Sequence, residues 1–167
     1  MKISISSLLG RPSGTIQKFA LDEAIHFPQG HLDLTEHVTG QIQLLKLPNE
    51  INVQIKNLAT VAKTICSRCL ISILIQIKIP LVDREFIIDV PERDLELGEE
   101  VFYVNQHTNE IELDDMVREE LLLHFPAIPL CLGGCKGLCD QCGANRNETT
   151  CSCVPSESAS HPFKFLG

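Results

Sequence analysis

"LISILIQIKIP", residues 70–80, carries isoleucine at every second position from Ile71 to Ile79, with polar side chains at most of the positions between them. This two-residue period, broken only at Leu74, is typical of a β-strand with one apolar and one polar face. The stretch therefore predicts a strand that packs on a core with one face and meets water with the other.

The segments before this strand have a similar β-forming composition. Alternating or β-branched runs predict further strands at residues 40–47 (GQIQLLKL), 51–56 (INVQIK) and 61–66 (VAKTIC). Pro48, Asn49 and Glu50 predict a turn between the first two runs, and Ile3 and Ile5 indicate a strand at the start of the chain. We expect a curved antiparallel β-sheet or a small barrel-like β domain.

Residues 111–126, IELDDMVREELLLHFP, predict one acidic amphipathic helix. Asp114 is placed to cap its N-terminus, acidic side chains fill the first turn, and Pro126 ends it. Its apolar stripe is expected to pack on the sheet and complete an α+β fold. The stripe consists of Val117, Leu121, Leu122 and Phe125.

Charge is distributed unevenly along the chain. The 167 residues are 44% apolar, as in a globular protein, and have a net charge of −8. Residues 83–120 hold 14 acids against 3 arginines, a net of −11, which leaves +3 for the rest. Any contact with nucleic acid is therefore expected to avoid this acidic middle. Within it, residues 90–110 are interpreted as a surface loop in which VFYV (101–104) adds a strand.

The sequence predicts a cytoplasmic protein. No apolar run approaches the roughly 20 residues of a membrane span, and the N-terminus lacks the apolar core and cleavage site of a secretory signal. In a reducing compartment, paired cysteines are more often metal ligands than disulfides.

The chain has eight cysteines, which form four close pairs. Six of the eight cysteines lie within residues 129–153. The pairs are C-x-x-C at Cys66 and Cys69, C-x-x-x-C at Cys131 and Cys135, C-x-x-C at Cys139 and Cys142, and C-x-C at Cys151 and Cys153. Four pairs match two tetrahedral Zn²⁺ sites, because a tight turn can aim two thiolates at one ion.

The spacing favours one grouping of these cysteines. Cys139, Cys142, Cys151 and Cys153 would hold one zinc, since only eight residues separate their inner pair. The other zinc would take Cys131 and Cys135 from the tail and Cys66 and Cys69 from the end of a strand. A different grouping stays open, because Cys135 and Cys139 are also close in sequence.

The predicted zinc sites are structural. Residues 131–153 have few large apolar side chains, so burial does not offset an ordering entropy of about 1–2 kcal/mol per residue, whereas a structural zinc site contributes about 10–16 kcal/mol. Four complete cysteine pairs leave no open position for catalysis. We expect no enzymatic activity and no small-molecule substrate. A thiol redox or metal-handling role centred on Cys66 and Cys69 is an alternative.

These motifs, in this order, resemble the YceD family, the large ribosomal RNA subunit accumulation proteins. The shared motifs are the first C-x-x-C, V-x-E-E-L-L-L at 117–123, P-L-C at 129–131, the cysteine-rich run at 135–147 and C-x-C at 151–153, and HPFKFL near the end is similar to the family's short tail. Asp140 and Arg146 depart from the family's usual Pro and Leu. The resemblance implies a non-enzymatic cytoplasmic factor that supports 23S rRNA accumulation and large-subunit assembly.

Two modes of action follow. In the first, the chain would bind 23S rRNA or a large-subunit ribosomal protein through basic residues. The basic residues that lie among the cysteines could instead screen the negative charge of the sulfurs. The candidates are Lys46, Lys56, Lys63, Lys78, Arg68, Lys136 and Arg146. Alternatively, it is a zinc-stapled protein-interaction module whose acidic segment, 83–120, docks on a basic partner.

The sequence divides the chain into four parts. We expect a β-rich domain with the first C-x-x-C at 1–89, an acidic loop at 90–110, a helix packing on the sheet at 111–125, and a zinc-binding tail at 126–167.

Overall fold

The computed structural model describes residues 1–27, 32–88, 102–105 and 107–153. They belong to two compact units, which are treated separately. The sheet unit comprises Met1–Thr64 and Leu74–Ala127, and the cysteine unit comprises Ile65–Ile73 and the chain from Ile128. Most of the predicted acidic loop and the HPFKFL tail lie outside the described residues.

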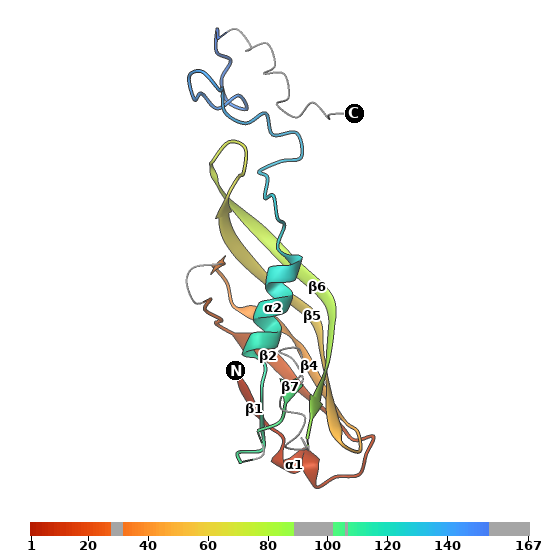
Figure 1. Cartoon of the computed structure of the whole chain (residues 1–167). Coiled ribbons are helices and arrows are strands. Elements are labelled where there is room, and N and C mark those ends of the chain that lie inside the picture. Colours follow the sequence, from red (N-terminus) through yellow and green to blue (C-terminus); the bar gives the residue numbers. More distant parts are fainter. Residues whose placement is uncertain (28–31, 89–101, 106, 154–167) are drawn as a thin grey trace, which may run out of the picture. The chain divides into compact units, whose positions relative to one another are not determined.

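A six-stranded sheet with the strand order β2-β4-β5-β6-β7 dominates the fold, and β3 pairs with β5 off this path (Figure 1). Its strands are β2 (Ile16–Glu23), β3 (Asp33–Leu34), β4 (Val38–Lys46), β5 (Glu50–Ile65), β6 (Ser72–Ile87) and β7 (Phe102–Tyr103). β2 pairs antiparallel with β4, both β3 and β4 pair antiparallel with β5, and β6 pairs parallel with β7. This path of described strands is open, so the barrel-like alternative is not confirmed.

The long strands β5 and β6 arise from the alternating patterns. The strand predicted at 70–80 is confirmed within β6, and the runs predicted separately at 51–56 and 61–66 form the single strand β5. Asn57 has a positive φ of 54° in the middle of β5. The buried positions there shift from odd to even numbers, which lets one strand keep its apolar side chains on one face.

Of the two strands nearest the start of the chain, the sequence analysis did not predict β2 and predicted β1. β2 is an edge strand whose pattern has one fully buried residue, Leu21, so its alternation is weak in the sequence. The predicted first strand is confirmed as β1 (Lys2–Ser4), which pairs with β8 (Glu110–Glu112) in a separate two-stranded sheet. A short helix, α1 (Ser6–Leu9), follows β1.

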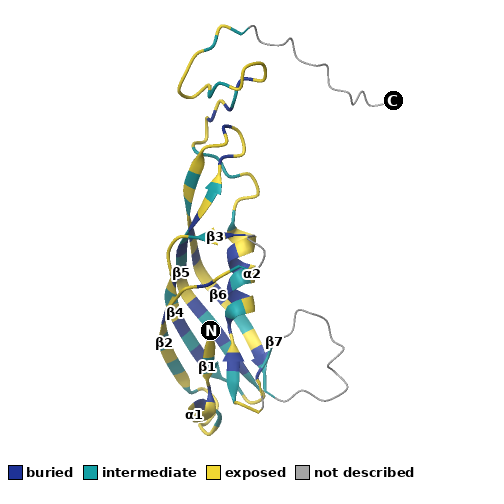
Figure 2. Ribbon diagram, turned by 90° about the vertical axis from the view of Figure 1, so that its left-hand side faces the viewer, coloured by how far each residue is buried: buried dark blue, intermediate teal, exposed yellow. Residues whose placement is uncertain are grey.

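The predicted helix is confirmed as α2 (Asp114–His124), which lies against one face of the sheet (Figures 1 and 2). Two details of its prediction are wrong. The N-cap is Leu113 without a side-chain cap, because the Asp114 carboxylate instead accepts from the Met1 ammonium group. Leu122 is 45% exposed, and Met116 takes its place among the buried side chains, since the helix presents its 116–117–121 side to the core.

One buried ion pair fastens α2 to the sheet. The Glu120 side chain is only 9% exposed, and its carboxylate is paired with the Arg84 guanidinium of β6. The His124 Nδ1 atom lies 3.6 Å from the other carboxylate oxygen. Burying this carboxylate would be unfavourable without the pair, so the helix and strand depend on each other here.

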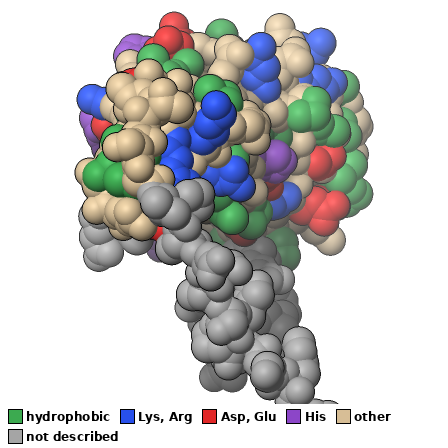
Figure 3. Space-filling view, turned by 90° about the horizontal axis from the view of Figure 1, so that it is seen from above, with side chains coloured by type: hydrophobic (Ala, Val, Ile, Leu, Met, Phe, Trp, Pro, Cys, Tyr) green, Lys and Arg blue, Asp and Glu red, His purple; other side chains and the backbone are tan. Residues whose placement is uncertain are grey.

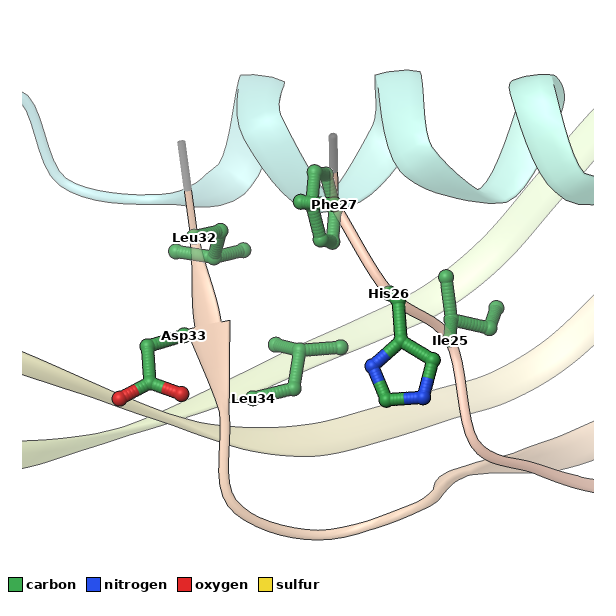
Figure 4. Close-up of a pocket in the computed structure, with 6 residues that line it drawn as sticks. All are labelled: Ile25, His26, Phe27, Leu32, Asp33 and Leu34. Carbon is green, nitrogen blue, oxygen red and sulfur yellow. The ribbon is translucent and has the colours of Figure 1, made fainter. Parts of the chain in front are cut away.

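A pocket of about 250 Å³ lies beside α2, between the ends of two chain segments (Figure 4). Phe27 and Leu32 lie toward the helix, whereas His26 and Asp33 lie farther from it. Arg118 of α2 donates from Nε to the His26 carbonyl at 3.2 Å. Of the described residues that line it, Ile25, Phe27, Leu32 and Leu34 are apolar, whereas His26 and Asp33 are polar.

Replacing Arg84 by methionine should destabilise the sheet unit. Arg84→Met leaves Glu120 buried without a cation, and we expect the free energy of unfolding to fall by about 2 kcal/mol, less than the roughly 3–5 kcal/mol of a fully buried pair because Arg84 is partly exposed. Urea unfolding followed by the fluorescence of Tyr103, the single tyrosine of the chain, measures the change.

The matched control is Lys2→Met. Lys2 and Glu112 form an ion pair in which both side chains are more than half exposed, so its loss should change stability by about 0.5 kcal/mol or less. Equal effects of the two substitutions would contradict the structural role of the Arg84–Glu120 pair.

Candidate metal centres

The structure brings the eight cysteines together in two groups of four, both within the cysteine unit. The first cluster is Cys66, Cys69, Cys131 and Cys135, and the second cluster is Cys139, Cys142, Cys151 and Cys153. In each, the four sulfur atoms all lie within 4.8 Å of one another. This is the grouping that the sequence spacing favoured.

The first cluster joins the turn between β5 and β6 to the C-terminal part of the chain. The Ser67 amide donates to the Pro129 carbonyl at 2.8 Å, and the Leu138 amide donates to the Arg68 carbonyl at 3.2 Å. A Cβ atom at Gly137 would lie 3.2 Å from that same carbonyl oxygen, so the absence of a side chain permits this close approach. Backbone hydrogen bonds thus hold the two cysteine pairs side by side.

The C-x-x-C turns of both clusters have the same backbone structure. In the first, the Leu70 amide donates to the Cys66 carbonyl and the Cys66 amide to the Ile71 carbonyl. The corresponding bonds of the second run from Gly143 to Cys139 and from Cys139 to Ala144. The residue after the second cysteine has a positive φ in both, 61° at Leu70 and 72° at Gly143. One local fold therefore presents both pairs of thiols.

The donor sets fit a tetrahedral ion of the size of Zn²⁺. Four sulfurs bound about 2.3 Å from a zinc ion lie about 3.8 Å apart. The Cys66 and Cys135 sulfurs are 3.7 Å apart, and those of Cys69 and Cys131 are 3.6 Å apart. A disulfide would need about 2.05 Å, and all eight thiols are free.

The thiols within each cluster differ in acidity. Although burial raises the pKa of Cys66, hydrogen bonds from the amides of Cys69 and Arg68 lower it to about 6. Amides of Cys142 and Gln141 likewise lower the pKa of Cys139 to about 6. Burial, followed by the neighbouring thiols, raises the pKa of Cys131 to about 12. Although burial raises the pKa of Cys135, hydrogen bonds from the Gly137 backbone and the Asn147 side chain lower it overall. Two thiolates of the first cluster and one of the second are thus stabilised before a cation arrives.

The second cluster also contains a thiol whose pKa is raised. The thiols of Cys142 and Cys139, together with burial, raise the pKa of Cys153 to about 12. Adjacent thiolates repel one another, so full ionisation of either cluster needs a bound cation.

Polar side chains outside the clusters contact the sulfurs. The Asn147 side-chain amide donates to the Cys135 sulfur at 3.3 Å, and its oxygen accepts from the Lys136 amide at 2.9 Å. The Arg146 guanidinium lies 3.7 Å from the Cys139 sulfur and pairs with Asp140 at 2.8 Å. Such contacts orient metal ligands and offset their negative charge.

Asn147 was missed by the sequence analysis. Its role depends on contact between Cys135 of the first cluster and the loop of the second cluster, which no spacing rule reveals. The asparagines flanking Arg146 were a weak signal, because asparagine commonly bonds nearby backbone in tight turns. Asn145 does so here, accepting from the Asn147 amide at 3.1 Å.

The structure separates the basic candidates into distinct environments. Arg68 donates to the Cys135 carbonyl at 3.0 Å, and Arg146 pairs with Asp140. Both arginines therefore make structural contacts within the cysteine unit. Lys46 donates to the carbonyls of Leu9 and Arg11 and helps to close the end of α1. Lys56, Lys63, Lys78 and Lys136 are exposed, as are Arg68 and Arg146 despite their contacts.

A comparison with known families returned a match to this part of the chain. A family model described as "Large ribosomal RNA subunit accumulation protein YceD" matches residues 56–167, more than half of the chain and all eight cysteines. No curated protein and no solved structure matches the chain.

The chain should bind two zinc ions, one per cluster. We expect Cys66→Ser combined with Cys69→Ser to reduce the stoichiometry from two to one, and Cys139→Ser combined with Cys142→Ser to do the same, because the clusters share no ligand. Native mass spectrometry of the purified full chain counts the ions. A single ion that survives loss of Cys66 and Cys69, or loss of both ions in either variant, would refute two independent sites.

Metal binding should release protons, and metal affinity should fall on acidification. At pH 7, Cys66 and Cys139 are mostly ionised while Cys131 and Cys153 keep their protons, so we expect fewer than four protons released per ion. Below about pH 6 the first two thiolates also protonate and compete with the metal. A pH indicator in weak buffer counts the protons. Metal affinity that stays constant between pH 5 and 8 would contradict this assignment.

Proposed function

The chain belongs to the YceD family of large ribosomal RNA subunit accumulation proteins, and from this membership we propose that it is a non-enzymatic, cytoplasmic factor supporting 23S rRNA accumulation and assembly of the large ribosomal subunit. The family match is the observation that carries the proposal. Among the described residues, no helix is long and apolar enough to span a membrane.

We further propose that each cluster holds one Zn²⁺ ion as a structural element. The all-cysteine donor sets and their sulfur spacing support this choice. When bound, the ions supply electrostatic cross-links between segments that have few apolar side chains. Arg68, Arg146 and Asn147 then position the sulfur ligands and offset their charge.

Direct contact with rRNA is proposed for the outer face of the sheet. Lys56, Lys63 and Lys78 are exposed there on the neighbouring strands β5 and β6, and their ammonium groups form no ion pair within the described part of the chain. Lys56 is opposite Gln41, and Gln43 is opposite Gln54, which places polar amides beside the cations. Figure 3 views the molecule from above rather than onto this face of the sheet, and Lys and Arg side chains lie next to apolar ones there as well. Such a surface suits phosphate and sugar contacts.

The alternative, an acidic docking surface at 83–120, receives less support. Asp83 accepts hydrogen bonds from Asn52 and Gln54, and Glu120 is buried against Arg84. Asp114 is paired with the Met1 ammonium group. These acids stabilise the fold and are less available to a basic partner.

The thiol redox alternative is also less supported. It requires an exposed, acidic thiol at Cys66 or Cys69. Both side chains are buried, and although the pKa of Cys66 is lowered, that of Cys69 is raised.

Binding to 23S rRNA fragments should weaken as salt increases and depend on the three lysines. The triple variant Lys56→Gln, Lys63→Gln and Lys78→Gln is expected to lower the slope of log affinity against log salt by about 3, roughly one for each phosphate that a lysine no longer neutralises. Fluorescence anisotropy on labelled fragments measures the slope. Lys2→Gln is the control, because Lys2 lies in the other sheet and pairs with Glu112.

The same variants test the cellular role. Cells that lack the protein should accumulate less 23S rRNA relative to 16S rRNA, and the wild-type chain should restore the ratio. If the triple variant restores it fully while binding RNA poorly, a ribosomal protein is the direct partner. A ratio unchanged by loss of the protein would overturn the proposed function.

A further inference from the structure

The outer edge of β2 is regular and unpaired among the described strands. β2 ends the strand path and pairs there only with β4, and it lies at the border of the sheet in Figure 2. Its eight residues pair with β4 without a register shift, so the strand has no β-bulge, and it contains no proline. Such an edge is a template for pairing with another strand.

One hydrogen bond beside the ladder shows which backbone groups of β2 point outward. The Lys46 amide donates to the Thr15 carbonyl at 3.0 Å, immediately before the pair Ile16–Leu45 in the register of β2 and β4. Hydrogen-bonded pairs alternate along an antiparallel ladder, so the odd-numbered residues of β2 bond to β4. The amides and carbonyls of the even-numbered residues, from Ile16 to Asp22, therefore point away from the sheet.

The side chains of β2 alternate between a charged face and an apolar face. Lys18, Ala20 and Asp22 are exposed on the outer face, whereas Phe19 and Leu21 pack on the core side. Lys18 forms no ion pair within the described part of the chain. A lysine on an edge strand often prevents pairing with another strand. In β2, however, an acid lies on the same face four residues later.

This arrangement is complementary to itself. If two copies of β2 run antiparallel with Ala20 opposite Ala20, every outward-pointing residue meets another, and the hydrogen bonds of the ladder can form. Lys18 of each copy then lies opposite Asp22 of the other copy, and on the core side Phe19 lies opposite Leu21. Opposite charges and apolar side chains in such cross-strand pairs are stabilising. A slide by two residues in either direction removes both charge pairs.

The contacts already made by these residues are compatible with this pairing. The His37 Nδ1 atom lies 2.8 Å from one carboxylate oxygen of Asp22, but the Asp22 side chain is 71% exposed. The carboxylate can therefore accept from a lysine of another copy while it keeps His37. Ala20, at the centre of the pairing, has a small side chain that does not obstruct the approach of the two backbones.

We propose that two copies of the chain associate through β2 and join their sheets into one continuous sheet. The two-fold axis passes between the two Ala20 residues, so both copies contribute the same edge. Residues opposite each other in a ladder share a face, so the outer faces of both sheets lie on the same side. The dimer thereby places Lys56, Lys63 and Lys78 of both copies on one broad face. The association itself does not depend on the proposed contact with rRNA.

Sedimentation equilibrium of the full-length, zinc-loaded protein measures the association in the absence of RNA. We expect the average mass to rise with concentration from the 18.6 kDa of one chain toward twice that value. A chain that remains monomeric at about 1 mM would overturn the proposal. Since no nucleic acid is present, this result is distinguishable from a failure of the proposed rRNA contact.

Amide hydrogen exchange followed by NMR locates the interface. The amides of Lys18, Ala20 and Asp22 should exchange rapidly at low protein concentration and slowly at high concentration, because they gain acceptors only in the dimer. The amides of Phe19 and Leu21 bond to β4 and should be protected at both concentrations. A dimer in which the first three amides stay unprotected would place the contact elsewhere and contradict the proposal.

Charge substitutions test the register of the two strands. Lys18→Glu and Asp22→Lys each convert two attractive pairs into repulsive ones, and each should raise the dissociation constant by about tenfold or more. An equimolar mixture of the two variants should associate again, because every acid of one copy then lies opposite a lysine of the other. Lys136→Glu makes the same change of net charge in the cysteine unit and is the control. A mixture that stays monomeric would exclude this register.

Ala20→Pro tests the backbone contact independently of charge. Proline removes the amide at the centre of the proposed pairing, but that amide points away from β4, so an edge strand tolerates the substitution. We expect cooperative urea unfolding and two bound zinc ions to be retained while the dimer is lost. A dimer that survives both Ala20→Pro and Lys18→Glu would show that β2 is not the interface.

Discussion

The contact between four sulfur atoms from distant parts of the chain is the constraint on which the cysteine unit depends. Cys66 and Cys135 are 69 residues apart in sequence, and Cys69 and Cys131 are 62 residues apart, yet their sulfurs lie 3.7 and 3.6 Å from each other. Thiolates brought this close repel one another, so the arrangement is stable as an ionised site only with a cation. The surrounding peptide has few apolar side chains to replace that stabilisation.

The sheet unit is stabilised by a different kind of interaction. Its core is a single set of apolar side chains, mostly aliphatic, to which the buried Arg84–Glu120 pair adds an electrostatic link. Several acids that give the middle of the chain its negative charge are engaged in such internal contacts. The sheet unit can therefore present lysines on its outer face although the whole chain is acidic.

The two C-x-x-C turns show that different residues can build one local structure. Both use the same backbone hydrogen bonds and the same left-handed residue. Gly143 meets that requirement without strain, whereas Leu70 meets it with strain and exposes an apolar side chain.

The sequence by itself determined the strands with strong alternation, the helix from Asp114 onward, and the cysteine pairs with their favoured grouping, because periodicity and spacing are local properties. It did not reveal β2, whose edge position weakens its alternation, or the orientation of α2, which buries Met116 and exposes Leu122. The engagement of Lys46 by carbonyls and of Asn147 by a cysteine of the other cluster also required tertiary structure. These contacts join residues far apart in sequence, so only the folded chain decides them.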